Sequence, residues 1–349
     1  MKLRAAANSY TLAGLALALA LPLSLHAQHW RLYVDNSNGE DVSVIDLHSL
    51  KLVDDISIGA SLIHGLALTP GGKLLFVTVE SDHTLRLVDT RTKQMMATIK
   101  LSGRPNECAV TPDGRYVAVP IRDGDSVDIV DVMEKKVVKT LPIKEPHNAV
   151  STASNRYLFV SSMGSNAVNV IDLKTMSFSA VIPAGGRPRP YVISSDGKTM
   201  YVAVSYLHGF DIVNIEDKKV LQRVEMPAQH TGPPRPRKFE TPDTLTHGLA
   251  LTPDGKELWV TSLLDDCIYI YDLQAGKFTG RLDTGDGPNW IVFSPDGKYG
   301  CVSNTDSDDV SIFDVRERRA LARVKVGKVP KRLVIGSEPK AQKSGPAKV

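Results

Sequence analysis

Short strands of alternating apolar and polar residues recur along the chain between about residues 31 and 335. The segments 127–131 (VDIVD) and 268–272 (IYIYD), for example, carry an apolar side chain at every second position. That period is typical of a β-strand whose two faces meet different surroundings. No stretch in this range has the spacing of an amphipathic helix. The pattern therefore predicts an all-β protein.

Tight turns divide these strands into units of similar length. The clearest turns read Pro-Asp-Gly, with Pro suited to the first central position and Gly to a position of positive φ. The turns begin at Thr69, Thr111, Thr152, Ser194, Thr252 and Ser294. Successive turns lie 42, 41, 42, 58 and 42 residues apart. Each unit holds four short strands, which is the make-up of one blade of a β-propeller.

The number of units follows from the third strand of each, which ends in Asp or Asn. These ends are Asp46, Asp89, Asp131, Asp172, Asn214, Asp272 and Asp314, so seven blades are expected. The first unit begins at its second strand, 31–34, and the segment 332–335 has the pattern of the innermost strand that it lacks. We therefore predict a seven-bladed β-propeller of four-stranded antiparallel blades over residues 28–336. Pairing of the C-terminal strand into the first blade would close the ring.

The repeat resembles that of the YVTN β-propeller family, whose second strand carries a Tyr-Val-Thr-Asn run. Its variants here include 75–78 (LFVT), 258–261 (LWVT) and 301–304 (CVSN), and the resemblance extends over nearly all of residues 31–335. It implies the propeller fold and leaves function open, because the motif residues belong to strands and turns. Similar propellers include surface-layer and periplasmic binding proteins, a small periplasmic group implicated in single-stranded DNA binding, carriers of d-type haem, and lactonases related to phosphogluconolactonase.

The two ends of the chain differ from the repeats. Lys2 and Arg4 precede an apolar run at 11–25, and the small residue Ala27 follows, which is the layout of a secretory signal peptide. We predict that residues 1–27 are removed on export and that the protein is periplasmic or secreted, with no membrane span in the mature chain. An uncleaved anchor is the alternative. Residues 337–349 lack apolar content and are predicted to form a disordered tail.

Charge and cysteine content narrow the classes of function. The net charge is +3, and two of the positive charges, Lys2 and Arg4, lie in the predicted signal peptide. A near-neutral mature chain argues against nucleic acid as a partner. Cys108, Cys267 and Cys301 form an odd set without a CxxC motif. A ring stapled by disulfides is therefore not expected, and the redox state of the three thiols is left open.

The central channel is where a ligand site is expected, because the loops that enter the innermost strands surround its mouth. The residue five positions before each turn marks this place in every blade. The seven residues are His64, Asn106, His147, Arg189, His247, Asn289 and, from the closing strand, Lys331. All are polar or basic, so we predict a site for a small anionic or planar ligand. The alternative is that they satisfy strand ends around a water-filled channel.

Three of these seven residues are histidines, and they come from alternate blades 2, 4 and 6. His64, His147 and His247 are therefore candidate metal ligands. Their spread around the ring does not suit a tetrahedral zinc site, whereas one His as the axial ligand of a planar cofactor is easier to accommodate. The sequence leaves open whether a metal or cofactor binds, and which one.

The longest step between turns, 58 residues, marks an insertion in blade 5. It spans residues 226–246, is rich in proline and runs into His247 on the face of the channel mouth. Its basic side chains are His230, Arg235, Arg237 and Lys238. We interpret the segment as a lid, or as a docking loop for a protein partner with a local basic patch. A surface insertion without function is the alternative.

No catalytic motif accompanies these features. The sequence lacks GxSxG, HExxH and a Walker loop, and the absence of CxxCH excludes covalently attached c-type haem. We therefore favour a non-catalytic binding or interaction protein that uses the channel-mouth face. The alternative is a cofactor- or metal-dependent enzyme, a d-type haem-handling protein or a lactonase-like hydrolase. Its site would then be formed by His64, His147, Arg189 and His247.

Overall fold

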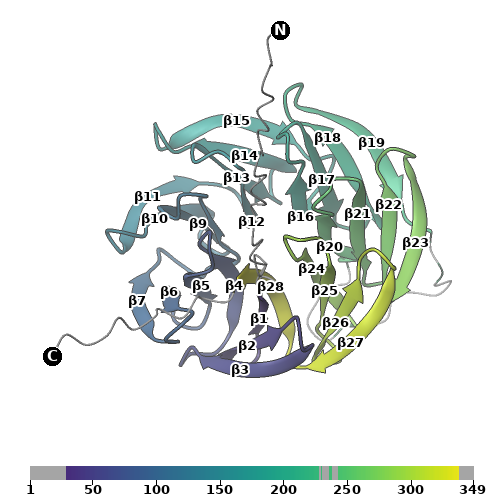
Figure 1. Ribbon diagram of the computed structural model, residues 1–349. Coiled ribbons are helices and arrows are strands. Elements are labelled where there is room, and N and C mark those ends of the chain that lie inside the picture. The colour runs from purple at the N-terminus through teal and green to yellow at the C-terminus, as the bar shows by residue number, and fades with distance from the viewer. Residues whose placement is uncertain (1–28, 228, 230–235, 238–242, 338–349) are drawn as a thin grey trace, which may run out of the picture.

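The computed structural model describes residues 29–227, 229, 236–237 and 243–337. Over these residues the chain forms seven four-stranded antiparallel sheets arranged in a ring (Figure 1), and the described elements are all strands. The predicted seven-bladed β-propeller is confirmed. The described residues contain no helix that is long and apolar enough to cross a membrane.

Blades are built from four strands each, counted outward from the central channel. The innermost strands are β4 (Ile63–Leu68), β8 (Ala109–Val110), β12 (Pro146–Ser151), β16 (Pro188–Ile193), β20 (Thr246–Leu251), β24 (Pro288–Phe293) and the C-terminal β28 (Pro330–Ser337). The second strands are β1 (Trp30–Asn36), β5 (Leu74–Val79), β9 (Tyr116–Ile121), β13 (Tyr157–Ser162), β17 (Thr199–Val204), β21 (Glu257–Ser262) and β25 (Tyr299–Asn304).

The outer half of each blade follows the same order. The third strands are β2 (Asp41–Asp46), β6 (Thr84–Asp89), β10 (Ser126–Asp131), β14 (Ala167–Asp172), β18 (Gly209–Asn214), β22 (Cys267–Asp272) and β26 (Asp309–Asp314). The outermost strands are β3 (Lys51–Ser57), β7 (Met95–Lys100), β11 (Lys136–Pro142), β15 (Ser177–Pro183), β19 (Lys219–Glu225), β23 (Lys277–Asp283) and β27 (Arg319–Lys325). All seven third strands end on the predicted Asp or Asn.

The ring is closed by a strand from the far end of the chain. β28 pairs antiparallel with β1, with Leu32 opposite Ile335 and Val34 opposite Leu333. The first blade therefore has the strand order β28-β1-β2-β3. In Figure 1 the yellow β28 lies beside the purple β1. The predicted closure is confirmed, and it leaves β1 paired along both of its edges. The predicted tail lies outside the described residues from 338 onward.

Apolar side chains fill the spaces between neighbouring blades. Phe76 of β5, for instance, belongs to the same buried cluster as Val117 of β9 in the next blade. The alternating pattern supplies such contacts because each blade packs one face against each neighbour. The three cysteines are buried free thiols: Cys108, Cys267 and Cys301. Packing and strand pairing therefore hold the described ring together without disulfides.

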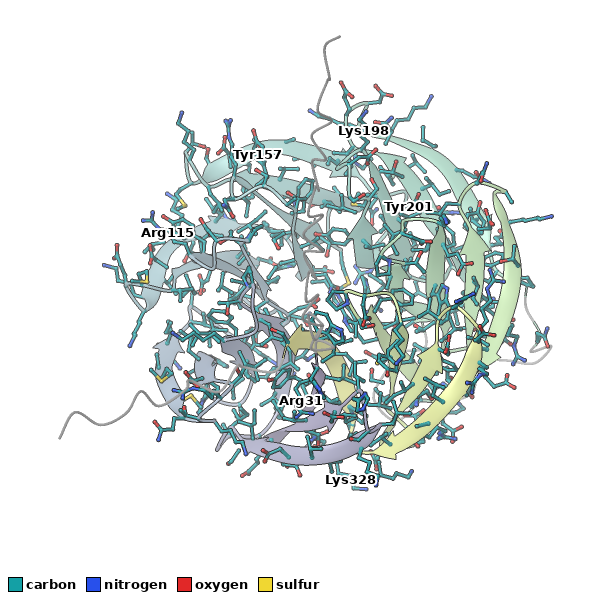
Figure 2. The ribbon with its side chains drawn as sticks, in the orientation of Figure 1. Arg31, Arg115, Tyr157, Lys198, Tyr201 and Lys328 are labelled. Atoms are coloured by element: carbon teal, nitrogen blue, oxygen red, sulfur yellow. The ribbon has the colours of Figure 1, made fainter. Side chains whose placement is uncertain are left out.

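Charged side chains cover the periphery of the ring, and Figure 2 shows Arg115 and Tyr157 there, on blades 3 and 4. A basic residue lies over the tyrosine that begins the second strand in both blades. The Arg115 guanidinium is 4.9 Å from the centre of the Tyr116 ring, and that of Arg156 is 5.0 Å from the Tyr157 ring. These arginine–tyrosine contacts belong to the outer surface of the blades and not to the channel.

A bulge recurs at the channel end of the innermost strands. In blade 2 the register shifts by one residue, so that His64 and Gly65 of β4 together oppose Thr78 of β5. The same shift occurs in β12, β16, β20, β24 and β28. In blade 3 a register shift lies between the isolated bridge of Pro105 with Ile121 and the residue pairs of β8 with β9. Because a bulge leaves an extra residue without a ladder partner, each blade presents two consecutive residues at the channel.

A hydroxyl on the second strand satisfies the backbone that a bulge leaves unpaired. Thr78 Oγ1 accepts a hydrogen bond from the Gly65 N–H at 2.7 Å and donates one to the Asn106 carbonyl of the next blade at 2.6 Å. Ser303 Oγ likewise donates to the Lys331 carbonyl at 2.6 Å. Further hydroxyls that accept a bulge N–H are Ser161 and Thr261. These are the Thr or Ser residues of the Tyr-Val-Thr-Asn run, so the motif residue joins neighbouring blades.

Removal of β28 should open the ring. A chain that ends after Pro330 loses the pairing of β28 with β1, so the edge of β1 is exposed to other chains. We expect a lower thermal unfolding midpoint and aggregation, measured by circular dichroism and by size-exclusion chromatography with light scattering. A chain shortened only by residues 338–349 is the control. A monomeric, equally stable truncation after Pro330 would contradict the role of the closing strand.

Loss of one bridging hydroxyl should destabilise the whole ring. Thr78→Val removes the partner of two buried backbone groups while it keeps the shape of the side chain, so the free energy of unfolding should fall by about 2–4 kcal/mol. Urea unfolding measures this change. Thr98→Val is the matched control, because Thr98 lies exposed on β7, and it should change stability by less than about 0.5 kcal/mol. Equal effects of the two variants would contradict the bridging role.

Candidate functional site

The seven predicted channel residues occupy equivalent places at the start of the innermost strands. They are His64 in β4, Asn106 just before β8, His147 in β12, Arg189 in β16, His247 in β20, Asn289 in β24 and Lys331 in β28. Five of them are buried, whereas His64 and Lys331 are half-buried. Side chains that are far apart in the sequence therefore surround one opening. That they bind a ligand stays a prediction.

Two of the three histidines meet in the channel. The ring centres of His147 and His247 lie 6.5 Å apart in an edge-to-face arrangement, although blade 5 separates their strands. The His247 ring also lies 6.0 Å from the ring of Trp290 in β24. Nδ1 of His147 is hydrogen-bonded to the side-chain oxygen of Asn148. The three rings therefore form one cluster on one side of the channel.

An arginine from the closing strand connects this cluster to a buried carboxylate. The Arg332 guanidinium lies over the Trp290 ring at 4.2 Å, and its Nε is 3.7 Å from Oε1 of Glu107. The other oxygen of Glu107 accepts a hydrogen bond from Asn148 Nδ2, and Asn148 contacts His147 in turn. The contacts form one closed cycle. We call its members the channel network: Glu107, His147, Asn148, His247, Trp290 and Arg332.

Sequence reasoning finds only part of the channel network. The spacing of five positions before each turn identifies His147 and His247, but it passes over Glu107 and Asn148. The reason is the bulge, which brings a second residue of each innermost strand to the channel. The residue four positions before each turn is therefore also a channel position. Reading both positions finds every member of the channel network.

His64 belongs to a separate group at the mouth. Its Nδ1 lies 2.6 Å from Oε1 of Glu80, and Arg104 Nε donates to the other oxygen of Glu80 at 2.7 Å. His247 also engages Nδ1, with the Asn289 carbonyl oxygen at 2.9 Å. Within the described ranges no three His, Cys, Asp or Glu side chains are grouped to hold a metal ion. A histidine whose Nδ1 is held by the protein is oriented for ligation through Nε2, so whether one of these histidines ligates a cofactor stays a prediction.

The insertion is joined to the channel ring and to neighbouring loops by ion pairs. Arg189 donates to Asp243 at 2.7 Å. Arg237 pairs with Asp266 at 2.8 Å and with Asp306 at 3.4 Å. These two aspartates come from loops of blades 6 and 7, so they neutralise the one arginine of the predicted basic patch that the structure describes. The patch residues His230, Arg235 and Lys238 lie outside the described residues.

Two of the three channel histidines, His64 and His147, have lowered pKa values, which favours their neutral forms. Burial lowers the pKa of His147 well below its ordinary value, and nearby cations such as Arg189 and Arg332 lower it further. Burial also lowers the pKa of His64 to about 4, although the hydrogen bond to Glu80 opposes this shift. Neutral imidazoles can accept a hydrogen bond or ligate a metal, but they contribute no positive charge toward an anion.

Two buried carboxyl groups near the channel titrate close to neutral pH. Burial raises the pKa of Glu107 to about 7, and the positive charge of Arg332 offsets this effect only in part. Burial likewise raises the pKa of Asp35 to about 7. The Asp35 side chain accepts hydrogen bonds from the backbone N–H groups of Lys331 at 2.8 Å and Arg332 at 2.5 Å. Glu107 in the channel network and Asp35 at the ring closure can therefore each gain or lose a proton near neutral pH.

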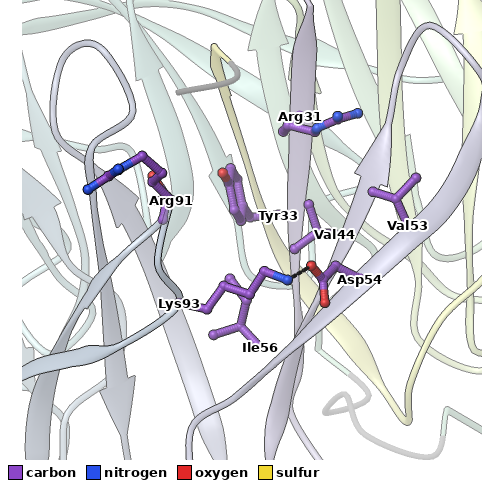
Figure 3. A pocket seen from close by; sticks show the side chains of 9 residues that line it. Arg31, Tyr33, Val44, Val53, Asp54, Ile56, Arg91 and Lys93 are labelled. Carbon is purple, nitrogen blue, oxygen red and sulfur yellow. Dashed lines mark ion pairs between the residues drawn. The ribbon is translucent and has the colours of Figure 1, made fainter. Parts of the chain in front are cut away.

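Two hollows elsewhere on the described surface lie away from the channel network. One of about 270 Å³ lies between β1–β3 of blade 1 and the turn 90–93 of blade 2. Figure 3 shows Lys93 of that turn paired with Asp54 across it. The other, of about 710 Å³, is a groove between the turns of blades 6 and 7, at the opposite end of those blades from the channel mouth. Neither is lined by a member of the channel network.

Comparison of the sequence with known families gives two matches. The model described as "Lactonase, 7-bladed beta-propeller" matches residues 175–332, and the model described as "YNCE-like beta-propeller" matches residues 75–234. The chain is similar to both propeller families. The expected resemblance to repeat propellers with lactonase-type relatives is therefore confirmed. None of the curated proteins matches the chain.

Solved structures share the fold at low sequence identity. Hydrazine synthase of Kuenenia stuttgartiensis is 23% identical with a TM-score of 0.66, over 76% of this chain and 87% of that chain. The dihydro-heme d1 dehydrogenase NirN, in complex with DHE, is 17% identical with a TM-score of 0.63, over 87% and 74%. A putative 6-phosphogluconolactonase from Bacteroides fragilis NCTC 9343 is 16% identical with a TM-score of 0.72, over 89% and 99%. At these identities the likeness shows the fold alone.

The free energy of unfolding should depend on pH through Glu107. Because burial raises its pKa from 4.5 to about 7, the folded chain keeps a proton in this pH window that the unfolded chain has lost. The contribution of this group is therefore most favourable below about pH 4.5 and falls as pH rises to 7, by about 3 kcal/mol in all. Glu107→Gln does not titrate, so its stability relative to the natural chain should increase by that amount between pH 4.5 and 8.

Urea unfolding of both chains at several pH values measures this difference. Glu40→Gln is the matched control, because Glu40 is exposed, and its stability should follow that of the natural chain at every pH. Parallel pH profiles of the natural chain and Glu107→Gln would show that the Glu107 carboxyl group has the same pKa in the folded and unfolded states.

Proposed function

We propose that the protein is an exported, non-catalytic binding protein that holds a planar, acidic ligand at the channel mouth. The observation that carries the proposal is the cluster of rings: His147 and His247 lie 6.5 Å apart, and Trp290 lies beside them. Flat rings stack on a planar ligand, and Trp290 is only half-buried, so part of its surface is open to a ligand. Export is proposed from residues 1–27, which lie outside the described residues.

The charge at the mouth supports a ligand with few acidic groups. Arg332 lies over Trp290, so one cation stands close to the ring cluster, and the positive charge of Lys331 acts on His64 at the mouth and lowers the pKa of that imidazole. Arg332 itself faces Glu107, and two further arginines of the mouth are paired, Arg104 with Glu80 and Arg189 with Asp243. A polyanion such as DNA gains affinity from many unpaired cations. The pairing of these arginines therefore favours a ligand with one or two acidic groups over a nucleic acid.

A second candidate is a cofactor-dependent or lactonase-like role. The observation that favours it is the oriented imidazole of His64, whose Nδ1 is held by Glu80 while Arg104 holds Glu80. Such an imidazole serves as an axial ligand of haem or as a general base. A bound haem-type group, held by His64 or His147 through Nε2, would supply redox chemistry. The similarities to the lactonase propellers and to NirN support the same class of role.

Metal-free protoporphyrin, which is planar and carries two carboxylates, is a suitable probe of the first candidate. We expect saturable quenching of tryptophan fluorescence by the natural chain. Binding should weaken about tenfold in Trp290→Leu, which loses the half-buried stacking surface, and in His247→Gln, which loses the ring that packs against Trp290. Trp30→Leu is the matched control. The Trp30 indole is hydrogen-bonded to Asp296 at the opposite end of the blades, at 2.9 Å. Failure of the natural chain to bind protoporphyrin would overturn the planar-ligand proposal.

Haemin separates the two candidates. An axial histidine gives a shifted Soret band that is lost in His64→Ala or His147→Ala, and metal analysis of the protein purified after export should then detect iron. This outcome would favour the cofactor role. Equal binding of haemin and protoporphyrin without a histidine-dependent shift would favour stacking alone.

A further inference from the structure

Arg332 has an unfilled hydrogen-bonding edge inside the channel. Its side chain is 1% exposed, and Nη1 donates to Oδ1 of Asn289 at 3.2 Å. Nε and Nη2 have no hydrogen-bond partner among the described residues. These two nitrogens lie on the same edge of the guanidinium, and such an edge binds a carboxylate through two parallel hydrogen bonds. Because buried donors without acceptors are costly, this edge points to a bound acceptor.

The carboxylate of Glu107 does not fill that edge. Its Oε1 is 3.7 Å from Arg332 Nε, which is beyond hydrogen-bonding distance. The other oxygen of Glu107 is held by Asn148, while the Arg332 guanidinium is held over the Trp290 ring. The Glu107 carboxylate therefore lies near Arg332 but forms no hydrogen bond with Nε or Nη2 of that side chain.

Other polar groups in this part of the channel also lack partners. The amide oxygen and nitrogen of Asn106, a side chain that is fully buried, have none among the described residues, and neither has the buried hydroxyl of Tyr191. Burial raises the pKa of Tyr191, and the charge of Glu107 raises it further, so the two groups are near each other. Arg332, Asn106 and Tyr191 come from blades 1, 3 and 5. Three blades thus each contribute a buried polar group without a partner among the described residues.

We propose that Nε and Nη2 of Arg332 bind the carboxylate of a small hydroxy acid inside the channel, with Asn106 and Tyr191 as partners of its remaining polar atoms. Arg332 lies one residue further along its strand than the mouth residue Lys331, whereas Asn106 is itself one of the mouth residues. This site differs from the planar-ligand site in the size and class of its ligand. It rests on the proposed function only in placing a ligand in the same channel.

Binding at this site should be linked to protonation of Glu107. A bound carboxylate brings a second negative charge close to Glu107, and two like charges in a buried site disfavour ionisation of one of them. Other titratable or charged groups lie around Glu107 and the bound carboxylate. They are Asp35, His64, Cys108, His147, Tyr191, His247, Lys331 and Arg332. Glu107 is the carboxyl group that faces the Arg332 guanidinium as an ion pair. Affinity for the acid should therefore rise as pH falls from 8 to 6.

Glycolate, which carries one carboxylate and one hydroxyl, is the probe. It is titrated into the full mature chain by calorimetry at pH 8 in two buffers of different ionisation enthalpy, because the difference in heat counts protons. We expect saturable binding with uptake of about one proton. Arg332→Lys should bind at least about tenfold more weakly, since lysine cannot form the two parallel hydrogen bonds. Glu107→Gln should bind at least as tightly as the natural chain, with about zero proton uptake.

The matched control is Arg115→Lys at the periphery, which should leave glycolate binding unchanged. Absence of saturable binding, or binding unaffected by Arg332→Lys, would overturn the proposal. If Arg332→Lys does not fold, Tyr191→Phe and Glu107→Gln decide instead. Unchanged affinity in the first together with unchanged proton uptake in the second would equally overturn it. The protoporphyrin measurement uses another ligand and other variants, so failure of one site leaves the test of the other intact.

Discussion

The propeller depends on a hydroxyl hydrogen bond at the channel end of its blades. Where two residues of an innermost strand oppose one residue of the second strand, a buried N–H is left without a ladder partner and would cost about 1–3 kcal/mol. The Thr78 hydroxyl accepts that hydrogen bond from Gly65 and donates another to the Asn106 carbonyl in the next blade. One small side chain therefore both permits the bulge and joins two blades. This double role explains why Thr or Ser recurs at the third position of the Tyr-Val-Thr-Asn run.

At the closure of the ring, a carboxyl group takes the place of the hydroxyl. Asp35 accepts hydrogen bonds from the backbone N–H groups of Lys331 and Arg332, the two residues of the closing bulge. The oxygens of a carboxyl group can accept two such bonds at once, so this group suits a junction that must hold a strand from the other end of the chain. The same pairing of β28 with β1 places Arg332 at the channel. Closure of the fold and assembly of the channel network are therefore one event, because the arginine reaches Glu107 and Trp290 only when β28 is paired.

Blade number, turns and the closing strand could be predicted from the sequence, because each follows from a local pattern that the chain repeats. The positions of His147 and His247 could be predicted for the same reason. The pairing of Glu107 with Asn148 and its approach to Arg332 could not. A repeat gives the place of a residue around the ring, but not how far its side chain reaches across the channel or which neighbour it meets. The insertion shows the same limit, since the acidic partners of Arg237 come from other blades.

The seven blades share one backbone framework, but they place different side chains at equivalent positions of the channel. These differences favour a ligand site over a channel filled only with water. In blades 2 and 6 the second bulge residue is glycine, and a Cβ there would lie 2.7 Å from Cα of Glu107 at Gly65 and 2.7 Å from the Asn289 carbonyl oxygen at Gly248. Glycine therefore lets the next innermost strand approach closely in these two blades. Blades 1, 3 and 4 carry the polar side chains of Arg332, Glu107 and Asn148 at the same position, whereas blade 5 carries Pro190 and blade 7 carries Trp290. The rings of the channel network come from blades 4, 6 and 7, whereas the unpaired polar atoms of Arg332, Asn106 and Tyr191 come from blades 1, 3 and 5. Seven equal side chains would offer a ligand no preferred orientation, whereas the different side chains of these blades would offer an acidic ligand ring contacts at some blades and hydrogen-bonding groups at others.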